Sequence, residues 1–209
     1  MSPLPLQLLW AGLAFLLGAL PFSVWVGRAA ARRDIREVGD RNPGATNVLR
    51  AGGGAWFVLA LALDVSKAAV PVGLAYQNLG WRGWPMLLIA LAPPLGHAFS
   101  PFLGGRGGKA LATALGVWIG LSLWPMPQVV LLGVGFWFIW LTTSGWVVIL
   151  TLLTTLAYLV FFRPDPLLIA VAAGQLALLA YTHRADLARP PALRRIHRLR
   201  GSRQERKER

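Results

Sequence analysis

The sequence contains no cysteine and few residues of the kinds that usually carry covalent or metal chemistry. Without cysteine there is no disulfide, no thiolate nucleophile and no thiolate metal site. The three histidines, His97, His183 and His197, do not stand at metal-ligand spacings, and no Gly-x-Ser-x-Gly motif is present. We therefore expect no metal, no cofactor and no covalent attack by a protein nucleophile.

Charged residues are also scarce, at 14 % of the chain, whereas a soluble domain has about 25 %. Hydrophobic residues make up 56 % and occur in long runs, which indicates an integral membrane protein. The 21 basic residues outnumber the 8 acidic ones and gather in 28–50 and after residue 183. Basic residues beside membrane spans set orientation and contact anionic lipids. Membrane lipids, and not nucleic acid, are the expected partners of this charge.

The apolar runs predict an all-α bundle of about seven transmembrane helices. We place them at 4–27, 55–77, 84–99, 110–124, two within 128–162, and 167–182. A single tilted helix in 128–162 would give five. Either odd number puts the N-terminus outside and the basic loops and the C-terminus in the cytoplasm. We divide the chain into a membrane domain, 1–182, and a basic cytoplasmic tail, 183–209, which we expect to contact lipid through Arg194, Arg195, Arg198 and Arg200.

Two features stand out inside the spans. Asp64 and Lys67 lie three residues apart, so they can pair on one helix face. Such a pair either fixes helix packing, takes part in substrate binding, or marks a small transporter, although no internal repeat is visible. Pro93 and Pro94 predict a kink or an unwound turn in the third span.

A polar, turn-rich stretch, 39–50, follows the first span. Thr46 or Asn47 can cap a helix there. Arg50, four residues after Thr46, then shares its face and offers a forked cation. Together with Asn42 these side chains suit a phosphate or a carboxylate. The alternative interpretation is a plain hydrophilic loop between two spans.

A second polar stretch, 97–109, leads into the fourth span and resembles a phosphate loop. Its glycines let backbone N–H groups approach an anion, and a cation stands where the helix starts. The alternative is a flexible connection. The stretch is not a Walker loop, because that motif has Ser or Thr after the lysine and this chain has Ala110. The residues concerned are His97, Gly104, Gly105, Arg106, Gly107, Gly108 and Lys109.

A third polar cluster begins at His183, which ends the last span. A histidine there is either a cap or a general acid or base. The predicted topology places all three clusters on the cytoplasmic side. They are rich in cations and glycine and poor in nucleophiles, which suits a site that binds and aligns phosphates.

The motifs resemble one family over nearly the whole chain. They are LPFSVWVGR, DIREVGDRNPGATNVLR, DVSK, GHAFSPFLGGRGGKALAT and the histidine that ends the last span. They are similar to those of the bacterial membrane-bound acyl-phosphate:glycerol-3-phosphate acyltransferases. The resemblance implies a multi-pass protein of the cytoplasmic membrane that transfers a fatty acyl group from acyl phosphate to the 1-hydroxyl of glycerol 3-phosphate. The product is lysophosphatidic acid, and acyl-CoA is not used.

The resemblance also implies roles for individual residues. It assigns catalysis to Arg50, Lys109 and His183, and substrate binding to Asn42, Thr46, Asn47, His97, Gly105, Arg106, Gly107 and Gly108. The proton acceptor stays open between His183, a water and the substrate's own phosphate. The chain departs from the family motifs at Asp40 (usually Ser), Arg41 (Gly), Pro43 (Ile), Ala68 (Gly) and Asp186 (Asn). A degenerate relative that binds a lipid phosphate without transfer is therefore an alternative.

Overall fold

A computed structural model of the chain describes residues 3–194. Across this part the regular structure is helical, and the β pairing amounts to an isolated bridge between Leu141 and Leu193. The helices are α1 (Leu4–Ala19), α2 (Phe22–Ala31), η1 (Ile35–Glu37), α3 (Ala45–Gly52), α4 (Gly54–Gly73), η2 (Leu74–Asn78), α5 (Gly83–Ala98), η3 (Pro101–Leu103), α6 (Leu111–Ser122), α7 (Pro125–Trp140), α8 (Ser144–Phe162), α9 (Pro166–Thr182) and α10 (Arg184–Leu187).

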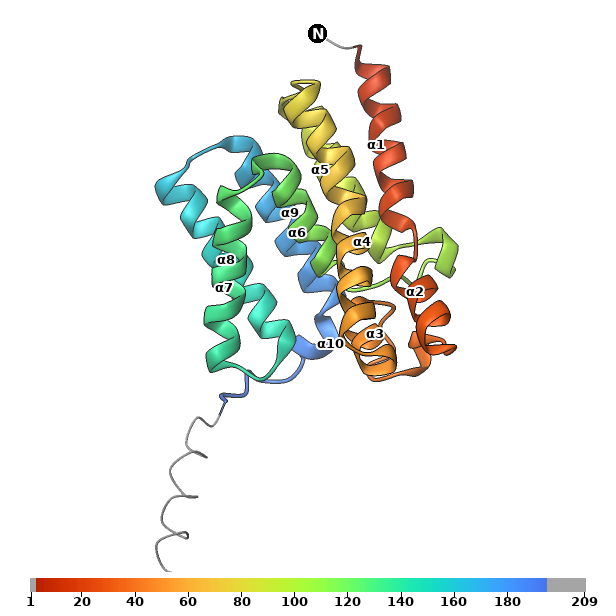
Figure 1. The fold of residues 1–209 in the computed structure, drawn as a ribbon. Helices are drawn as coiled ribbons and strands as arrows, with labels where there is room; N and C mark the ends of the chain where they lie inside the picture. Colours follow the sequence, from red (N-terminus) through yellow and green to blue (C-terminus); the bar gives the residue numbers. More distant parts are fainter. Residues whose placement is uncertain (1–2, 195–209) are drawn as a thin grey trace, which may run out of the picture.

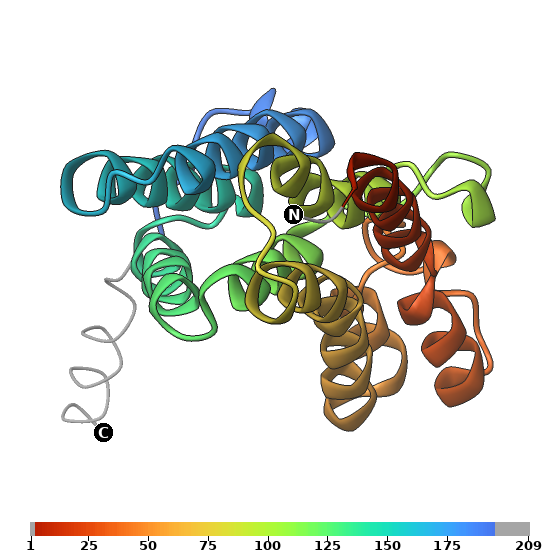
Figure 2. The same cartoon turned by 90° about the horizontal axis from the view of Figure 1, so that it is seen from above.

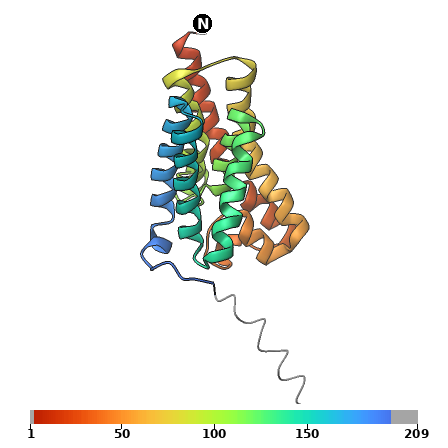
Figure 3. The ribbon, with the colours of Figure 1, turned by 90° about the vertical axis from the view of Figure 1, so that its left-hand side faces the viewer.

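The longer helices lie side by side in a bundle. Helices α1 and α4 to α9 alternate in direction between its two ends (Figures 1 and 3). The short helices α2, α3 and α10 gather at the end opposite the N-terminus (Figure 1). From above, α7, α8 and α9 lie together on one side and α1 to α4 on the other (Figure 2). Polar segments far apart in the sequence thus reach the same end of the bundle.

The helices agree with the expected spans in position. Four helical stretches are long and apolar enough to cross a membrane: Leu4–Ala31, Gly54–Asn78, Gly83–Leu103 and Ser144–Phe162. Helices α6, α7 and α9 are apolar but shorter. The run 128–162 divides between α7 and α8, as the two-span interpretation predicts. The structure is that of an all-helical membrane protein, and the number of crossings stays a prediction.

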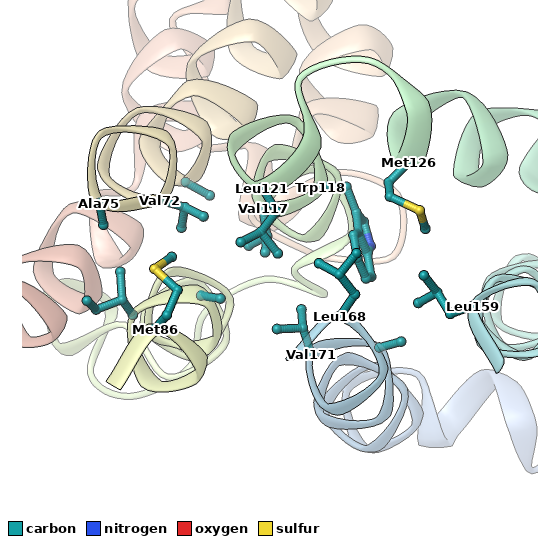
Figure 4. Close-up of a cluster of buried hydrophobic side chains, with 14 of the residues drawn as sticks. Val72, Ala75, Met86, Val117, Trp118, Leu121, Met126, Leu159, Leu168 and Val171 are labelled. Carbon is teal, nitrogen blue, oxygen red and sulfur yellow. The ribbon is translucent and has the colours of Figure 1, made fainter. Parts of the chain in front are cut away.

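A cluster of buried apolar side chains is formed by all the long helices from α4 through α9 (Figure 4). Trp118 of α6 is fully buried beside Met126, Leu159 and Leu168, which come from the three following helices. Close approach of α4 and α6 depends on small residues, because a Cβ on Gly116 would overlap a carbonyl of α4. Small residues serve helix packing in membranes, where lipid removes most of the hydrophobic drive.

Two prolines behave differently from the expectation. Of the kink or unwound turn expected at Pro93 and Pro94, the unwound turn is absent, because helix α5 continues through both residues. The helix is braced there by α1, which lies so close that a Cβ on Gly18 would overlap the Pro93 carbonyl. The first span, expected to be continuous, instead breaks into α1 and α2 at Leu20 and Pro21. Proline has no N–H to donate, so a helix turn is lost there.

The first residues of the tail pack on the bundle. The Trp146 indole N–H donates to the Arg189 carbonyl at 2.8 Å, and the Thr142 N–H donates to the Ala192 carbonyl at 2.9 Å. The Arg194 guanidinium lies 4.3 Å from the centre of the Phe138 ring. The proposed lipid contacts of Arg195, Arg198 and Arg200 fall outside the described residues. The boundary at residue 182 stays a prediction.

Candidate functional site

A cavity of about 520 Å³ opens at the end of the bundle that holds α3 and α10. Its wall comes from three segments far apart in the sequence: 36–43, 98–109 and 181–184. The three polar stretches therefore meet around one space. Each segment brings basic side chains to the wall, which is lined by Arg36, Arg41, Arg106, Lys109 and Arg184.

Lys109 lies where the three segments meet. Its ammonium is 3.0 Å from Asp40 Oδ2 and 3.0 Å from Asp186 Oδ2. Its main chain is held as well, because the Thr182 hydroxyl donates to the Lys109 carbonyl at 3.1 Å. We call Asp40, Lys109 and Asp186 the Lys109 triad. The side chain is thus fixed at the cavity wall, next to the start of α6 at Leu111.

The Lys109 triad keeps its lysine charged. Burial by itself would lower the pKa of Lys109, but the hydrogen bonds to Asp186 and Asp40 outweigh it, and the pKa is raised. Burial would likewise raise the pKa of Asp40, yet the hydrogen bonds from Lys109 and from the Asn42 N–H lower it. A cation in this place can bind a phosphate, but the phosphate must compete with two carboxylates.

The turn 39–44, which we call the Asn42 loop, is held by Asn47. The Asn47 amide donates to Asp40 Oδ1 and to the Asn42 carbonyl, both at 2.9 Å, and only 1 % of the residue is exposed. We had expected Thr46 or Asn47 to cap α3, but neither does. Gly44 is the N-cap, and Asn47 lies inside the helix with its side chain bonded back to the loop. Asn47 therefore positions the loop and does not line the cavity.

Arg50 lies behind Asn47. One guanidinium nitrogen donates to Asn47 Oδ1 at 2.8 Å and is 3.9 Å from Asp40 Oδ1. Half of the side chain is exposed, so part of its fork is free for another partner. Neither Arg50 nor the exposed Thr46 lines the cavity, whereas Asn42 does.

The glycine loop, residues 104–109, is not a nest of free amides. The N–H groups of Gly107 and Gly108 donate to the carbonyls of Ala98 and His97, each at 3.0 Å. The Gly105 N–H donates to the Ser100 carbonyl at 2.8 Å. The prediction that these three amides face an anion was wrong, because the carbonyls at the end of α5 take the Gly107 and Gly108 amides and the Ser100 carbonyl takes the Gly105 amide. Positive charge reaches the cavity through side chains instead.

The glycines of this loop serve close packing and backbone shape. Gly104 and Gly105 adopt φ of 64° and 76°, which side chains disfavour. A Cβ on Gly107 would overlap the His97 carbonyl. Gly105, Gly107 and Gly108 line the cavity, so the loop forms its floor without filling it.

The two described histidines are both buried, and neither lines the cavity. His97 sits beneath the glycine loop and is 9 % exposed. His183 is 3 % exposed, and only its neighbours Thr182 and Arg184 line the cavity. Its Nδ1 is 2.9 Å from the Leu179 carbonyl and donates to it, so Nε2 carries the lone pair. Burial lowers the pKa of His183, which leaves a neutral ring suited to accept a proton.

Among the cavity residues that sequence reasoning did not assign are Arg41, Arg184 and Tyr181. Arg41 and Arg184 bring cations, and Tyr181 brings an aromatic wall. The Arg184 guanidinium is 4.3 Å from the centre of the Tyr181 ring and also donates to its carbonyl. Each of the three lies within two residues of a position that we did single out. Adjacency to a motif was the available signal, and it does not reveal which side chains turn inward.

Fold and site together define a class: an all-helical membrane protein with a cation-rich cavity at one end. A family model described as glycerol-3-phosphate acyltransferase matches residues 8–191. The chain belongs to this family of acyltransferases, as the motifs indicated. A glycerol-3-phosphate acyltransferase of Maridesulfovibrio salexigens is 35 % identical over 187 residues, covering 88 % of this chain and 93 % of the relative. One from Bordetella petrii is 37 % identical, covering 85 % and 86 %.

Two solved structures are similar along the same length. The crystal structure of PlsY (YgiH), an integral membrane glycerol 3-phosphate acyltransferase, in its glycerol 3-phosphate form, has a TM-score of 0.77 and 32 % identity. Its lysophosphatidic acid form has a TM-score of 0.75 and 30 % identity. Each match covers 88 % of this chain and 90 % of the other.

Proposed function

We propose that the protein transfers a fatty acyl group from acyl phosphate to the 1-hydroxyl of glycerol 3-phosphate. The products are lysophosphatidic acid, a precursor of bacterial phospholipids, and inorganic phosphate. The observation that carries the proposal is the position of Lys109, a cation fixed where three segments meet at the cavity wall. The forms in which the similar structures were solved, with glycerol 3-phosphate and with lysophosphatidic acid, support this substrate and product.

The reaction needs alignment more than activation, because an acyl phosphate is already a reactive anhydride. The glycerol hydroxyl oxygen bonds to the acyl carbonyl carbon, and the bond from that carbon to the phosphate oxygen breaks. The hydroxyl proton leaves to a base, and the phosphate departs with the electron pair. Holding two substrates in line can supply about 7–11 kcal/mol of the barrier. Cations placed at the departing phosphate lower the barrier further.

The residues divide the work in this proposal. Lys109 and Arg50 neutralise phosphate charge, and Arg106 adds a cation from the glycine loop. His183 accepts the hydroxyl proton at Nε2, since its Nδ1 is occupied by the Leu179 carbonyl. Asn42 contacts the substrate from the wall, and Asn47 acts by holding the Asn42 loop.

The site is reached from the lipid as well as from water in this proposal. Phe99, Leu103 and Tyr181 give the cavity an apolar wall that suits an acyl chain. Helix α6 has 12 residues, a rise of about 18 Å against a hydrocarbon core of about 30 Å. Because α6 is shorter than the hydrocarbon core, the glycine loop that precedes it lies near the depth of the acyl chains. We place the protein in the cytoplasmic membrane with seven crossings, the N-terminus outside and the cavity facing the cytoplasm.

The test is acyl transfer by purified protein in detergent. Palmitoyl phosphate and glycerol 3-phosphate should give lysophosphatidic acid and inorganic phosphate in equal amounts, and palmitoyl-CoA should give none. Lys109→Met, checked for folding, is the control. A folded protein that binds glycerol 3-phosphate without transferring acyl groups would instead support the degenerate relative. The two carboxylates that hold Lys109 are the observation in favour of that alternative.

A further inference from the structure

A polar cluster lies buried beneath the glycine loop, which forms the floor of the cavity. The side chains of Asp64 and Lys67 are 2 % and 1 % exposed, and they form an ion pair of 2.8 Å on α4. The pairing expected from their spacing is thereby confirmed. The buried Ser23 hydroxyl donates to the other carboxylate oxygen of Asp64. Buried charges are costly in a membrane, so a paired and hydrogen-bonded cluster calls for a role.

Lys67 makes three contacts with groups that can accept a hydrogen bond. Besides Asp64, its Nζ lies 3.0 Å from the Leu20 carbonyl, which also accepts from the Phe22 N–H at the break between α1 and α2. It also lies 2.7 Å from His97 Nδ1. An ammonium has three N–H groups and accepts nothing. The contact with Asp64 is an ion pair, and since the ammonium only donates, His97 Nδ1 must be the acceptor in the contact between the two side chains.

The ring proton of neutral His97 is therefore on Nε2. This nitrogen has no protein partner among residues 3–194, and it lies against Gly108, where a Cβ would overlap it. Gly108 lines the cavity and is bonded through its N–H to the His97 carbonyl. His183 has the opposite arrangement, with Nδ1 donating and Nε2 free to accept.

We propose that Asp64 and Lys67 are positioning residues that hold His97 as the Nε2–H tautomer, so that it offers a hydrogen-bond donor beneath the glycine loop at the cavity floor. The inference rests on the proposed function, in which that floor receives a phosphate. The amides of Gly107 and Gly108 already donate to α5 carbonyls, so a side-chain N–H supplies the donor that these two cannot. One histidine then donates to the substrate anion, and the other accepts the proton.

The tautomer can be measured directly by ¹⁵N NMR of histidine-labelled protein in detergent. The chain has three histidines, and His97→Gln identifies the His97 signals by their loss. Wild-type protein should show a protonated Nε2 and an unprotonated Nδ1 for His97. The double variant Asp64→Asn/Lys67→Met removes the pair without leaving one buried charge, and it should give a mixture of tautomers. A protonated Nδ1 in the wild type, or an unchanged signal in the double variant, would overturn the proposal.

Kinetics provide the second measurement. The double variant should raise KM for glycerol 3-phosphate by about tenfold, the effect of losing one hydrogen bond to a charged group, with a smaller change in kcat. His97→Gln keeps an N–H near the Nε2 position and should raise KM less than His97→Asn, which should match the double variant. Equal losses in His97→Gln and His97→Asn would contradict a donor role.

A matched control separates positioning from packing. Ser66→Ala changes the residue beside Lys67. Within residues 3–194, the Ser66 hydroxyl bonds only to the Leu63 carbonyl of its own helix. It should leave both the tautomer and KM unchanged. A lower melting temperature in the double variant with an unchanged KM would show a packing role only. The NMR result does not require turnover, so a failure of the proposed acyl transfer would not be mistaken for a failure here.

Discussion

The ammonium of Lys109 and the carboxylate of Asp186 form an ion pair of 3.0 Å between positions 77 residues apart in the chain. The pair joins the start of α6 to α10 at the cavity wall. Asp40 completes the Lys109 triad from the Asn42 loop at the same distance. The family motifs usually carry neutral residues at both acidic positions. In the proposed reaction a substrate phosphate has to displace these carboxylates from Lys109.

We expect neutral residues at these positions to tighten substrate binding. Asp186→Asn and Asp40→Ser should each lower KM for glycerol 3-phosphate by about two- to fivefold, since partly exposed ion pairs are worth up to about 1 kcal/mol. Steady-state kinetics check this. Glu37→Gln removes an exposed acid from the same segment without touching Lys109, and it should leave KM unchanged. An increase in KM would show that the carboxylates position Lys109 instead of competing for it.

Arg50 should be needed for its shape as well as its charge. Arg50→Ala and Arg50→Lys should both lower kcat/KM by about 10²–10³, the usual effect of removing one transition-state contact. Lysine cannot make two parallel bonds to a phosphate. Transfer assays and melting temperatures on the same preparations check this, with the exposed Arg33→Ala as control. Near-normal transfer by a folded Arg50→Ala protein would falsify the assignment.

The seven crossings can be mapped by cysteine labelling, because the chain has no cysteine of its own. Cysteines at Arg33, Arg106 and Arg189 should react with an impermeant maleimide only after the cells are opened. Cysteines at Leu79 and Pro164 should react in intact cells. All five positions lie in described turns or loops or at helix ends, where labelling disturbs little packing. Labelling of Arg106→Cys in intact cells would reverse the orientation.

Helix positions and one ion pair were predictable from the sequence, because they depend on local spacing. Asp64 and Lys67 pair because they stand three residues apart on a helix, whatever surrounds them. Of the two interpretations of 128–162, the length of the run favoured a division near residue 142, since one helix of that extent exceeds a span, and the structure shows that division.

Other features depend on tertiary contacts that spacing does not record. The glycine loop looked like an anion nest, but the amides of Gly107 and Gly108 meet the carbonyls at the end of α5. A loop sequence does not reveal which carbonyls lie nearby. Pro93 suggested an unwound turn, but packing against α1 keeps α5 helical. The role of Asp186 likewise appears only once α10 folds against the start of α6.

The pH dependence of acyl transfer identifies the proton acceptor. Burial lowers the pKa of His183 below its ordinary value of 6.5, so the ring is neutral at pH 7 and becomes protonated only at lower pH. If His183 is the base, kcat should be constant at neutral pH and should fall as the pH drops through that lowered pKa, because a protonated ring accepts nothing.

His183→Gln tests this assignment against the substrate's own phosphate. General-base catalysis contributes about 10²–10⁴ in rate, so kcat should fall by that factor and the acid limb of the profile should vanish. His197→Gln, which removes a histidine from the tail, should change neither. If the phosphate of the substrate takes the proton, the acid limb persists in His183→Gln and kcat changes little. A folded variant with that profile would move the base from the protein to the substrate, and His183 would then serve only to cap α9.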